Sequence, residues 1–139
     1  IIRTNFFSFP DKNFKKNFLY FIFSNLKLKK EIRLFDDVRY SPISIVQLVK
    51  ALNKLIRLKK TGIYNISSNE RISKYKFGIL IANIFSLNKK LIKKTKVDNI
   101  LKVTRPKNMS LNNKKLKNLG IKITSLKSQI RFIFKNQAR

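Results

Sequence analysis

The sequence predicts an α/β fold with some parallel strand pairing, because segments typical of strands alternate with segments typical of helices. Short apolar runs rich in Ile, Phe and Tyr alternate with longer segments in which apolar residues recur at helical spacing. The clearest example runs from Gly62 to Phe85, where an apolar strand, a polar turn and an amphipathic helix follow one another. With 139 residues, 43% of them hydrophobic, the chain is long enough and apolar enough to form one packed domain.

The polar turn in this central stretch has two interpretations. In α/β proteins, ligands usually bind where a strand ends and a helix follows. Ser67, Ser68 and Asn69 also have side chains that bond nearby backbone and favour turns without any ligand. We favour the second interpretation, in which these residues only turn the chain.

Strand, helix and strand are expected before this stretch. Residues 1–9 form an apolar strand that Pro10 ends, and a helix then runs from a cap at Asp11 or Asn13 to about Leu28. Its apolar face is expected to contain Phe14, Phe18, Phe21, Ile22 and, as the weakest member, Leu26. Residues 32–35 form a short strand.

A second helix is expected to begin at Ser44. Residues 38–42 form a connecting loop, because Pro42 disfavours helical backbone at the residue before it. Ser44 and Gln47 form a capping-box pattern, and Ile43 is placed to pack on Leu48. The apolar face of this helix is expected to contain Ile45, Leu48, Val49, Leu52 and Ile56.

The C-terminal part is expected to contain three more helices. Ser73 caps the first, whose apolar face contains Phe77, Leu80, Ile81, Ile84 and Phe85. Residues 88–99 give no clear prediction, 100–103 form a short strand, and 104–111 form an irregular loop. The second helix has its cap at Asn112 and Gly120 just past its end, and Ser125 caps the last.

Composition excludes several kinds of chemistry. The chain has no Cys and no His, and only six carboxylates, so disulfides, thiolate nucleophiles and carboxylate-rich metal cages are not expected. Its longest apolar run, residues 18–23, is too short to cross a membrane. The net charge of +27 invites a nucleic-acid-binding interpretation, but the lysines are spread evenly along a chain that is also rich in Asn, Ile and Phe. We therefore favour solvated lysines over a dedicated nucleic-acid surface.

A succession of motifs runs through nearly the whole chain. They are Ile2-Arg-Thr-Asn-Phe-Phe7, Asp36-Asp-Val-Arg-Tyr-Ser-Pro42, Gly62-Ile-Tyr-Asn-Ile-Ser67 and Arg105-Pro-Lys-Asn-Met-Ser-Leu111, followed by Lys115-Leu116 and Leu119-Gly120-Ile121. This order resembles the C-terminal half of the dTDP-4-dehydrorhamnose reductase family. These are extended short-chain dehydrogenases that reduce the 4-keto group of a nucleotide-linked deoxysugar with NAD(P)H. The resemblance implies that residues 1–139 form the C-terminal part of an NAD(P)-binding Rossmann-like fold with its small substrate-binding subdomain.

The chain lacks two features of that family. It contains neither a Gly-rich dinucleotide loop nor a Tyr-x-x-x-Lys pair. We therefore expect a fragment that is inactive alone, and whether the protein is an enzyme stays open. A non-catalytic binding relative of the same fold is one alternative, and a basic nucleic-acid-binding protein is a less favoured one.

The resemblance also implies roles for individual residues. Thr4 and Asn5 would contact the nicotinamide cofactor, NADP or NAD, which is bound mainly by the absent N-terminal half. The substrate-binding residues would be Phe6, Ser41, Pro42, Arg105 and Asn108, with Arg105 on the diphosphate. Each has a structural alternative: a core ring for Phe6, a helix-entry turn for Ser41 and Pro42, a solvated side chain for Arg105 and a loop contact for Asn108.

No catalytic residue or metal ligand is assigned to this chain. The expected partner is a nucleotide sugar, with no membrane, and the expected compartment is the cytoplasm. Nucleic acid is disfavoured as a partner, and a homodimer stays open. The sequence departs from the family pattern at Thr104, where arginine is frequent, and at Ile43, where threonine is common.

Overall fold

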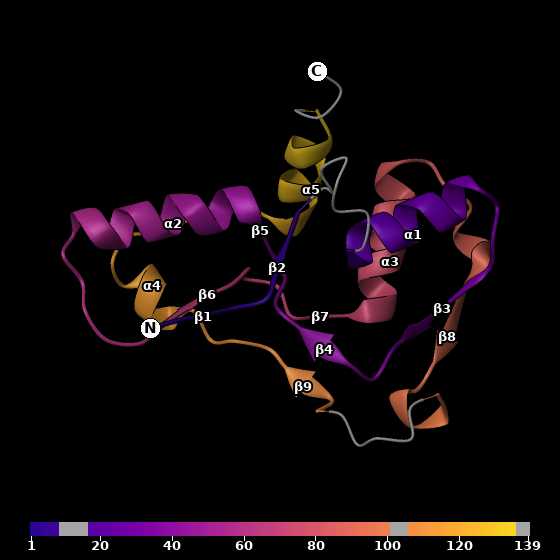
Figure 1. The fold of residues 1–139 in the computed structure, drawn as a ribbon, viewed down its shortest axis with the longest axis horizontal. Helices are drawn as coiled ribbons and strands as arrows, with labels where there is room; N and C mark the ends of the chain where they lie inside the picture. Colours follow the sequence, from indigo (N-terminus) through magenta and orange to yellow (C-terminus); the bar gives the residue numbers. More distant parts are fainter. Residues whose placement is uncertain (9–16, 101–105, 136–139) are drawn as a thin grey trace. The chain divides into compact units, whose positions relative to one another are not determined.

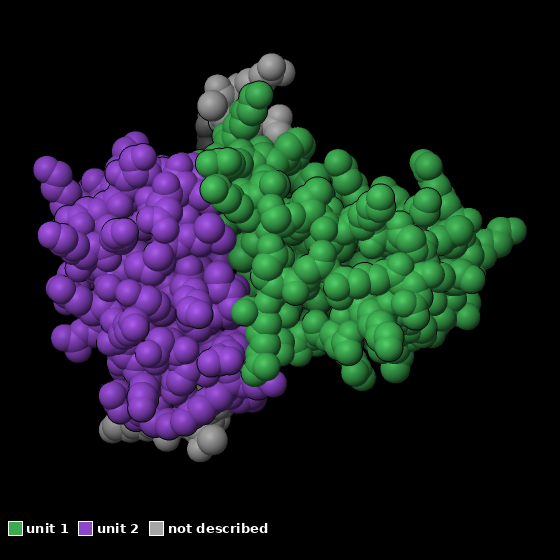
Figure 2. All heavy atoms as spheres, turned by 180° about the vertical axis from the view of Figure 1, so that it is seen from behind, with its two compact units in different colours: residues 1–8, 41–71, 110–139 green, residues 9–40, 72–109 purple. Residues whose placement is uncertain are grey.

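The computed structural model describes residues 1–8, 17–100 and 106–135. The chain divides into two compact units, which Figure 2 distinguishes by colour. Unit 1 comprises residues 1–8, 41–71 and 110–139, and unit 2 comprises residues 9–40 and 72–109. The central strand and its following helix, which the sequence analysis took as one βα element, fall into different units, because the division lies between Arg71 and Ile72.

The strands of unit 1 pair in parallel, as the alternation of strands and helices predicts. Strand β1 (Ile2–Thr4) pairs with β6 (Tyr64–Ile66), and β2 (Phe6–Phe7) pairs with β5 (Ile43–Ser44). The predicted strand 1–9 is thus two short strands, divided at Asn5, each with its own partner (Figure 1).

The helices of unit 1 are α2 (Ile45–Arg57), α4 (Lys114–Lys117) and α5 (Leu126–Lys135). The core that they cover consists of Ile43, Ala51, Leu55, Tyr64, Ile66, Leu116, Ile121 and Ile123, with Leu48, Leu52 and Leu119 packed against it. The predicted face of α2 is therefore partly wrong: Val49 is 46% exposed and Ile56 is 64% exposed, while Ala51 and Leu55 are buried. Positions 48, 51, 52 and 55 share one helix face, and the prediction passed over the small Ala51 in favour of larger neighbours.

Local chemistry fixes the helix ends where the sequence predicts. The hydroxyl oxygens of Ser44, Ser73 and Ser125 accept hydrogen bonds from backbone N–H groups in the first turns of α2, α3 and α5, at 3.3, 3.1 and 3.3 Å. The cap position of α4 is Asn113 rather than Asn112, although the Asn112 side chain still accepts from the Lys114 N–H at 2.9 Å. Gly120 follows α4 with a φ of +68°, the left-handed conformation that favours glycine there.

Unit 2 contains two helices, five strands and two short 3₁₀ turns among the residues that the structure describes. In chain order they are α1 (Phe18–Lys27), β3 (Ile32–Phe35), β4 (Arg39–Tyr40), β7 (Ile72–Ser73), α3 (Lys74–Ile84), η1 (Lys89–Leu91), β8 (Ile92–Thr95), η2 (Val97–Asn99) and β9 (Asn108–Met109). Strand β3 pairs in parallel with β8, while β4 lies between an antiparallel β7 and a parallel β9.

Two predicted connecting loops of unit 2 are strands. Residues 38–42 contain β4 and residues 104–111 contain β9, because two residues are enough for a ladder but too few for a sequence period. The segment 88–99, whose structure the sequence does not predict clearly, contains β8. The strand expected at residues 100–103 lies largely outside the described residues.

Helix α3 is the centre of unit 2. It packs against α1, β3 and β8. Its Phe77 is buried and stacks on Phe18, with ring centroids 5.9 Å apart. Gly78 permits close packing, because a Cβ at this position would collide with the Leu34 side chain of β3. The buried face of α3 therefore extends to Gly78 and Ala82, beyond the larger apolar residues that the sequence singled out.

Helix α1 differs from its prediction in its start and in one face residue. It begins at Phe18, where the side chain of Asn17 accepts from the Tyr20 N–H at 2.9 Å. The expected caps, residues 11 and 13, and the expected face residue at position 14 lie outside the described residues. Phe21 is 46% exposed, so its assignment to the buried face is wrong, whereas Ile22 and Leu26 are buried as expected. Leu19, which the prediction omitted, is fully buried in its place.

The bonds of Gln129 to the backbone at the start of α2 and before α5 lead to a prediction about stability. The buried Gln129 side chain accepts from the Ser44 N–H at 2.7 Å and donates to the Thr124 carbonyl at 2.7 Å. Gln129→Ala would leave both backbone groups unsatisfied, so we expect a loss of about 2–4 kcal/mol in the free energy of unfolding. Equilibrium urea unfolding followed by circular dichroism measures this loss. The control is Gln47→Ala, whose side chain makes no recorded bond among the described residues and whose cost should stay below about 1 kcal/mol. Equal losses in the two variants would contradict the prediction.

Candidate functional site

Strand pairing in unit 1 brings two groups of predicted site residues together. Phe6 lies opposite Ile43 in the β2–β5 ladder, and the Asn5 carbonyl accepts from the Ile43 N–H at 3.0 Å. The segment Thr4–Phe6 therefore runs beside the chain that leaves Ser41 and Pro42, although the two segments are far apart in the sequence. The site that the resemblance implies is thus partly assembled within one unit.

The first of these segments presents groups that could contact a ligand. The hydroxyl oxygen of Thr4 is buried and has no hydrogen-bond partner among the described residues. Phe6 is 60% exposed, whereas its neighbour Phe7 is 8% exposed and belongs to the core. The exposure of Phe6 argues against the core-ring alternative, and its contact with a substrate stays a prediction. Asn5, which lies between Thr4 and Phe6 in the sequence, is half-buried.

Ser41 and Pro42 are buried, at the entry to β5 and α2. This position fits the helix-entry turn that was their structural alternative. The strand that follows them pairs with β2, and their role in substrate binding stays a prediction.

The two remaining substrate-binding candidates are Asn108 and Arg105. Asn108 is exposed in β9 of unit 2, where it lies opposite Arg39. Arg105 lies outside the described residues, as does Thr104. Their assignments therefore stay predictions.

The polar turn after β6 is a structural junction. The buried Asn113 side chain donates to the carbonyls of Ser67 and Ser68, at 3.0 and 3.4 Å, and to the Asn69 side chain at 2.9 Å. Asn69 in turn donates to the Ile123 carbonyl at 3.2 Å. The polar groups of the turn are thus engaged with the C-terminal segment, which supports the interpretation that these residues only turn and tie the chain.

A lysine and two aromatic rings form a cluster in unit 2 that the sequence analysis missed. The ammonium group of Lys74 lies 3.9 Å from the centroid of the Tyr40 ring and 4.4 Å from that of Phe18. Among the described residues, no carboxylate is recorded as an ion-pair partner of Lys74. Burial lowers the pKa of Lys74 and raises the pKa of Tyr40 well above its ordinary value. Nothing in the spacing of these residues signals the contact, because a two-residue strand and a tertiary fold bring them together.

Metal-binding clusters and membrane-spanning helices are both absent from residues 1–8, 17–100 and 106–135. These residues contain no group of three or more His, Cys, Asp or Glu side chains that could hold a metal ion. None of their helices combines the length and the apolar character that a membrane span requires.

The strands that pair in parallel and the helices packed against them make the chain an α/β protein. Its fold is that of the C-terminal part of Rossmann-like reductases. The chain also belongs to a particular family, because residues 1–138 match the family model described as the RmlD substrate binding domain. The resemblance inferred from the motifs and the predicted fold class are both confirmed.

Solved structures of dTDP-4-dehydrorhamnose reductases share this fold. The structure from Bacillus anthracis, in complex with NADP, matches with a TM-score of 0.85 and 20% identity over 97% of this chain and 47% of that chain. The structure from Clostridium acetobutylicum matches with a TM-score of 0.86 and 19% identity over 99% of this chain and 48% of that chain. A hypothetical dTDP-4-dehydrorhamnose reductase from Sulfolobus tokodaii is 30% identical over 84% of this chain and 40% of that chain, with a TM-score of 0.71. The chain thus spans about half the length of these first two structures, and no curated protein matches its sequence.

The buried Tyr40 side chain leads to a prediction about how the free energy of unfolding depends on pH. Its hydroxyl is buried without a partner among the described residues, so Tyr40→Phe should change the free energy of unfolding at neutral pH by no more than about 1 kcal/mol, in the stabilising direction if at all. Burial raises the pKa of Tyr40 in the folded protein only, so above pH 10.0 the unfolded state releases a proton that the folded state keeps. That release destabilises the parent protein as the pH rises, and Tyr40→Phe should remove this part of the loss.

Urea unfolding of the parent and of Tyr40→Phe at pH values below and above 10.0 tests the prediction. The difference between the two should be constant below pH 10.0 and should then grow in favour of the variant. A difference that stays flat above this pH would show that the phenol is not desolvated in the folded protein.

Proposed function

We propose that this chain is the substrate-binding part of an NAD(P)H-dependent reductase that converts the 4-keto group of a nucleotide-linked deoxysugar to a hydroxyl. The family membership of residues 1–138 supports this proposal. The observation that carries it is the β2–β5 pairing, which brings the segment Thr4–Phe6 beside the chain that leaves Pro42. The buried hydroxyl of Thr4, which has no hydrogen-bond partner in the described part of the chain, and the exposed ring of Phe6 then lie two positions apart on this segment.

These groups suit the chemistry of such a substrate. An exposed ring such as Phe6 offers an apolar surface to the apolar face of a deoxysugar. The Thr4 hydroxyl can donate to an oxygen of the substrate or of the cofactor carboxamide. The planar guanidinium of Arg105 can bind a diphosphate in bidentate geometry, and Asn108 can add a hydrogen bond.

The nicotinamide cofactor, when bound, supplies the hydride. The sequence contains three glycines, Gly62, Gly78 and Gly120, and they are too far apart to form a Gly-rich phosphate loop. Residues outside this chain would therefore hold the cofactor phosphates, and only Thr4 and Asn5 of this chain would contact the nicotinamide side. The acid that protonates the new alkoxide would also come from outside this chain, since no residue here is assigned that role.

The proposal is tested by assays of the natural protein that contains this chain. Purified protein should oxidise NADPH or NADH only when dTDP-4-dehydrorhamnose is present, and NMR of the product should show the 4-keto group reduced. Saturable binding of the nucleotide sugar without turnover would instead identify a non-catalytic binding relative. Absence of both binding and turnover would overturn the proposal.

The exposed ring of β2 provides a specific test within that assay. Phe6→Ala should raise KM for the nucleotide sugar about tenfold, because about 1.4 kcal/mol of apolar contact is lost. Phe6→Leu should recover most of the loss, since it restores much of the apolar surface. The matched control is Phe21→Ala, which removes an equally large exposed ring from α1, 46% exposed, and should leave KM unchanged. Equal KM values for Phe6→Ala and the parent would exclude Phe6 from the substrate site.

The proposed diphosphate contact gives a second test. Arg105→Ala should lower kcat/KM about thirty- to a hundredfold, mainly through KM, because a charge-assisted contact contributes about 2–3 kcal/mol. Arg105→Lys should recover only part of this loss, since an ammonium cannot form the bidentate contact. Arg57→Ala, which removes an exposed arginine from the last turn of α2, is the control for lost charge. An unchanged kcat/KM in folded Arg105→Ala would show that Arg105 is solvated.

A further inference from the structure

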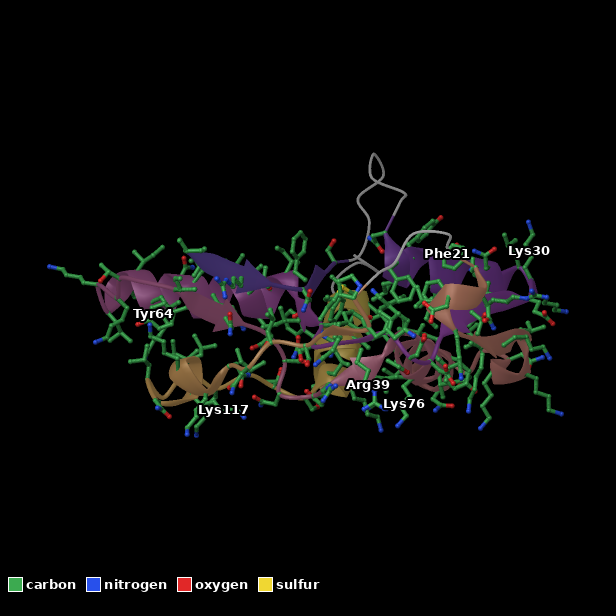
Figure 3. All side chains as sticks on the ribbon, turned by 90° about the horizontal axis from the view of Figure 1, so that it is seen from below. Phe21, Lys30, Arg39, Tyr64, Lys76 and Lys117 are labelled. Atoms are coloured by element: carbon green, nitrogen blue, oxygen red, sulfur yellow. The ribbon has the colours of Figure 1, made fainter. Side chains whose placement is uncertain are left out.

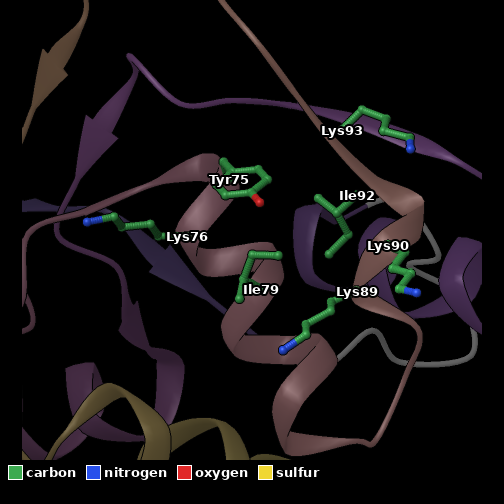
Figure 4. Close-up of a pocket in the computed structure, with 7 residues that line it drawn as sticks. All are labelled: Tyr75, Lys76, Ile79, Lys89, Lys90, Ile92 and Lys93. Atoms are coloured by element: carbon green, nitrogen blue, oxygen red, sulfur yellow. The ribbon is translucent and has the colours of Figure 1, made fainter.

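Unit 2 has a cavity, open to solvent, that is lined by none of the predicted site residues that the structure describes. Its volume is about 700 Å³, which is within the range of pockets that hold small molecules. The lining residues come from α3 and from the η1–β8 segment, and they are Tyr75, Lys76, Ile79, Lys89, Lys90, Ile92 and Lys93 (Figure 4). All of them belong to the same compact unit.

The rim of this cavity is strongly basic. Lys76, Lys89, Lys90 and Lys93 line it, and no carboxylate of residues 17–100 or 106–135 does. Lys93 pairs with Glu31 at 3.8 Å, but both side chains are about half exposed, so this ion pair compensates little of the charge. Like charges brought together around one cavity repel each other, and a bound anion would relieve that repulsion.

The floor of the cavity is apolar and partly aromatic. Ile92 is buried, and Tyr75 and Ile79 are half-buried. In Figure 4 the side chains of Tyr75 and Ile79 project from the α3 helix on the side of the strand that carries Ile92. The ammonium group of Lys94 lies 5.0 Å from the centroid of the Tyr75 ring, a contact that helps to hold the ring in place.

We infer that this cavity binds a small organic phosphate whose other part is flat and weakly polar, such as a nucleoside phosphate. A phosphate group carries up to two negative charges and several acceptor oxygens, which lysine ammonium groups bind as point charges. A free inorganic ion would leave the apolar floor unused, and an uncharged ring compound would leave the lysines unpaired. A ligand that carries both parts matches both halves of the cavity. The inference is independent of the proposed reductase function, since it uses none of the same residues.

A nucleic-acid strand has the same chemical parts, but the geometry favours the small ligand. The four lysines belong to one helix and one turn–strand segment and line a single cavity, and they do not follow an element in a continuous stripe. A cavity of about 700 Å³ has room for one nucleotide-sized molecule.

Isothermal titration calorimetry of the natural protein with ADP, adenosine and inorganic pyrophosphate tests the inference at about 0.1 M salt. ADP should bind at least about tenfold more tightly than either of its parts, because each part uses only half of the cavity. Absence of saturable ADP binding at about 1 mM ligand would overturn the inference.

Paired charge variants locate the site. Lys89→Gln/Lys90→Gln should weaken ADP binding about tenfold or more, because it removes two charges from the rim. The control Lys59→Gln/Lys60→Gln removes two exposed adjacent lysines just after α2 in unit 1 and should change the affinity less than about twofold. Equal weakening in the two variants would show that the protein's overall charge, and not this cavity, attracts the phosphate. Both changes lie at exposed positions, and thermal melts should confirm that each variant stays folded.

The aromatic floor is tested separately. Tyr75→Ala should reduce the preference for ADP over pyrophosphate about fivefold or more, while Tyr75→Phe should keep it, because the ring and not the hydroxyl supplies the contact. An unchanged preference in Tyr75→Ala would overturn the inferred role of the floor. Single-stranded oligonucleotides that bind far more tightly than ADP, with affinity rising with length, would identify a nucleic-acid surface and overturn the small-ligand inference.

Discussion

The side-chain amide of Asn113 is the contact on which the assembly of unit 1 depends. This unit is built from three segments, 1–8, 41–71 and 110–139, that are far apart in the chain. Asn113 donates to the turn that ends β6, so it joins the second segment to the third at a point where buried carbonyl groups would otherwise lack partners. Leaving such groups unpaired costs more than the net gain from an average hydrogen bond, so the junction tolerates little change. The neighbouring Leu116 then packs into the same core cluster as Ile66.

This junction also determines where the candidate site can lie. The turn fixes the position of the end of β6. Among the described residues, β6 is the only recorded partner of β1, with Ile2 opposite Tyr64. The position of β6 therefore determines the course of β1. The chain then passes through Asn5 and pairs a second time, with β5. Thr4 and Phe6 are therefore held by two separate ladders, one on each side of Asn5. A ligand contact at these residues would rest on backbone positioned by the core and not on a mobile loop.

The elements that the sequence predicted well are those that local chemistry decides. Ser44, Ser73 and Ser125 each cap a helix through a bond that spans three residues, so a short window contains the whole signal. Strand pairs such as β4–β9 and β3–β8 join segments far apart in the chain, and no local pattern encodes them. The candidate site follows the same rule. Thr4 and Phe6 could be proposed because the order of motifs resembles a family, whereas the contact of Lys74 with Tyr40 has no sequence pattern at all.

The large positive charge is accommodated in a way that the counts of charged residues do not suggest. The chain has six acidic residues against 33 basic ones, so carboxylates can neutralise few of the lysines. Several lysines lie instead over aromatic rings, and these contacts pair Lys27 with Phe23, Lys50 with Phe132, Lys74 with Tyr40 and Phe18, Lys94 with Tyr75, and Lys115 with Tyr64. A ring face attracts a cation without adding a charge of its own, so such contacts order the lysine stems while the net charge stays at +27. Lys76, Lys89 and Lys90 have no such ring and no carboxylate among the described residues, and all three line one cavity. An anion bound in this cavity would neutralise part of their charge.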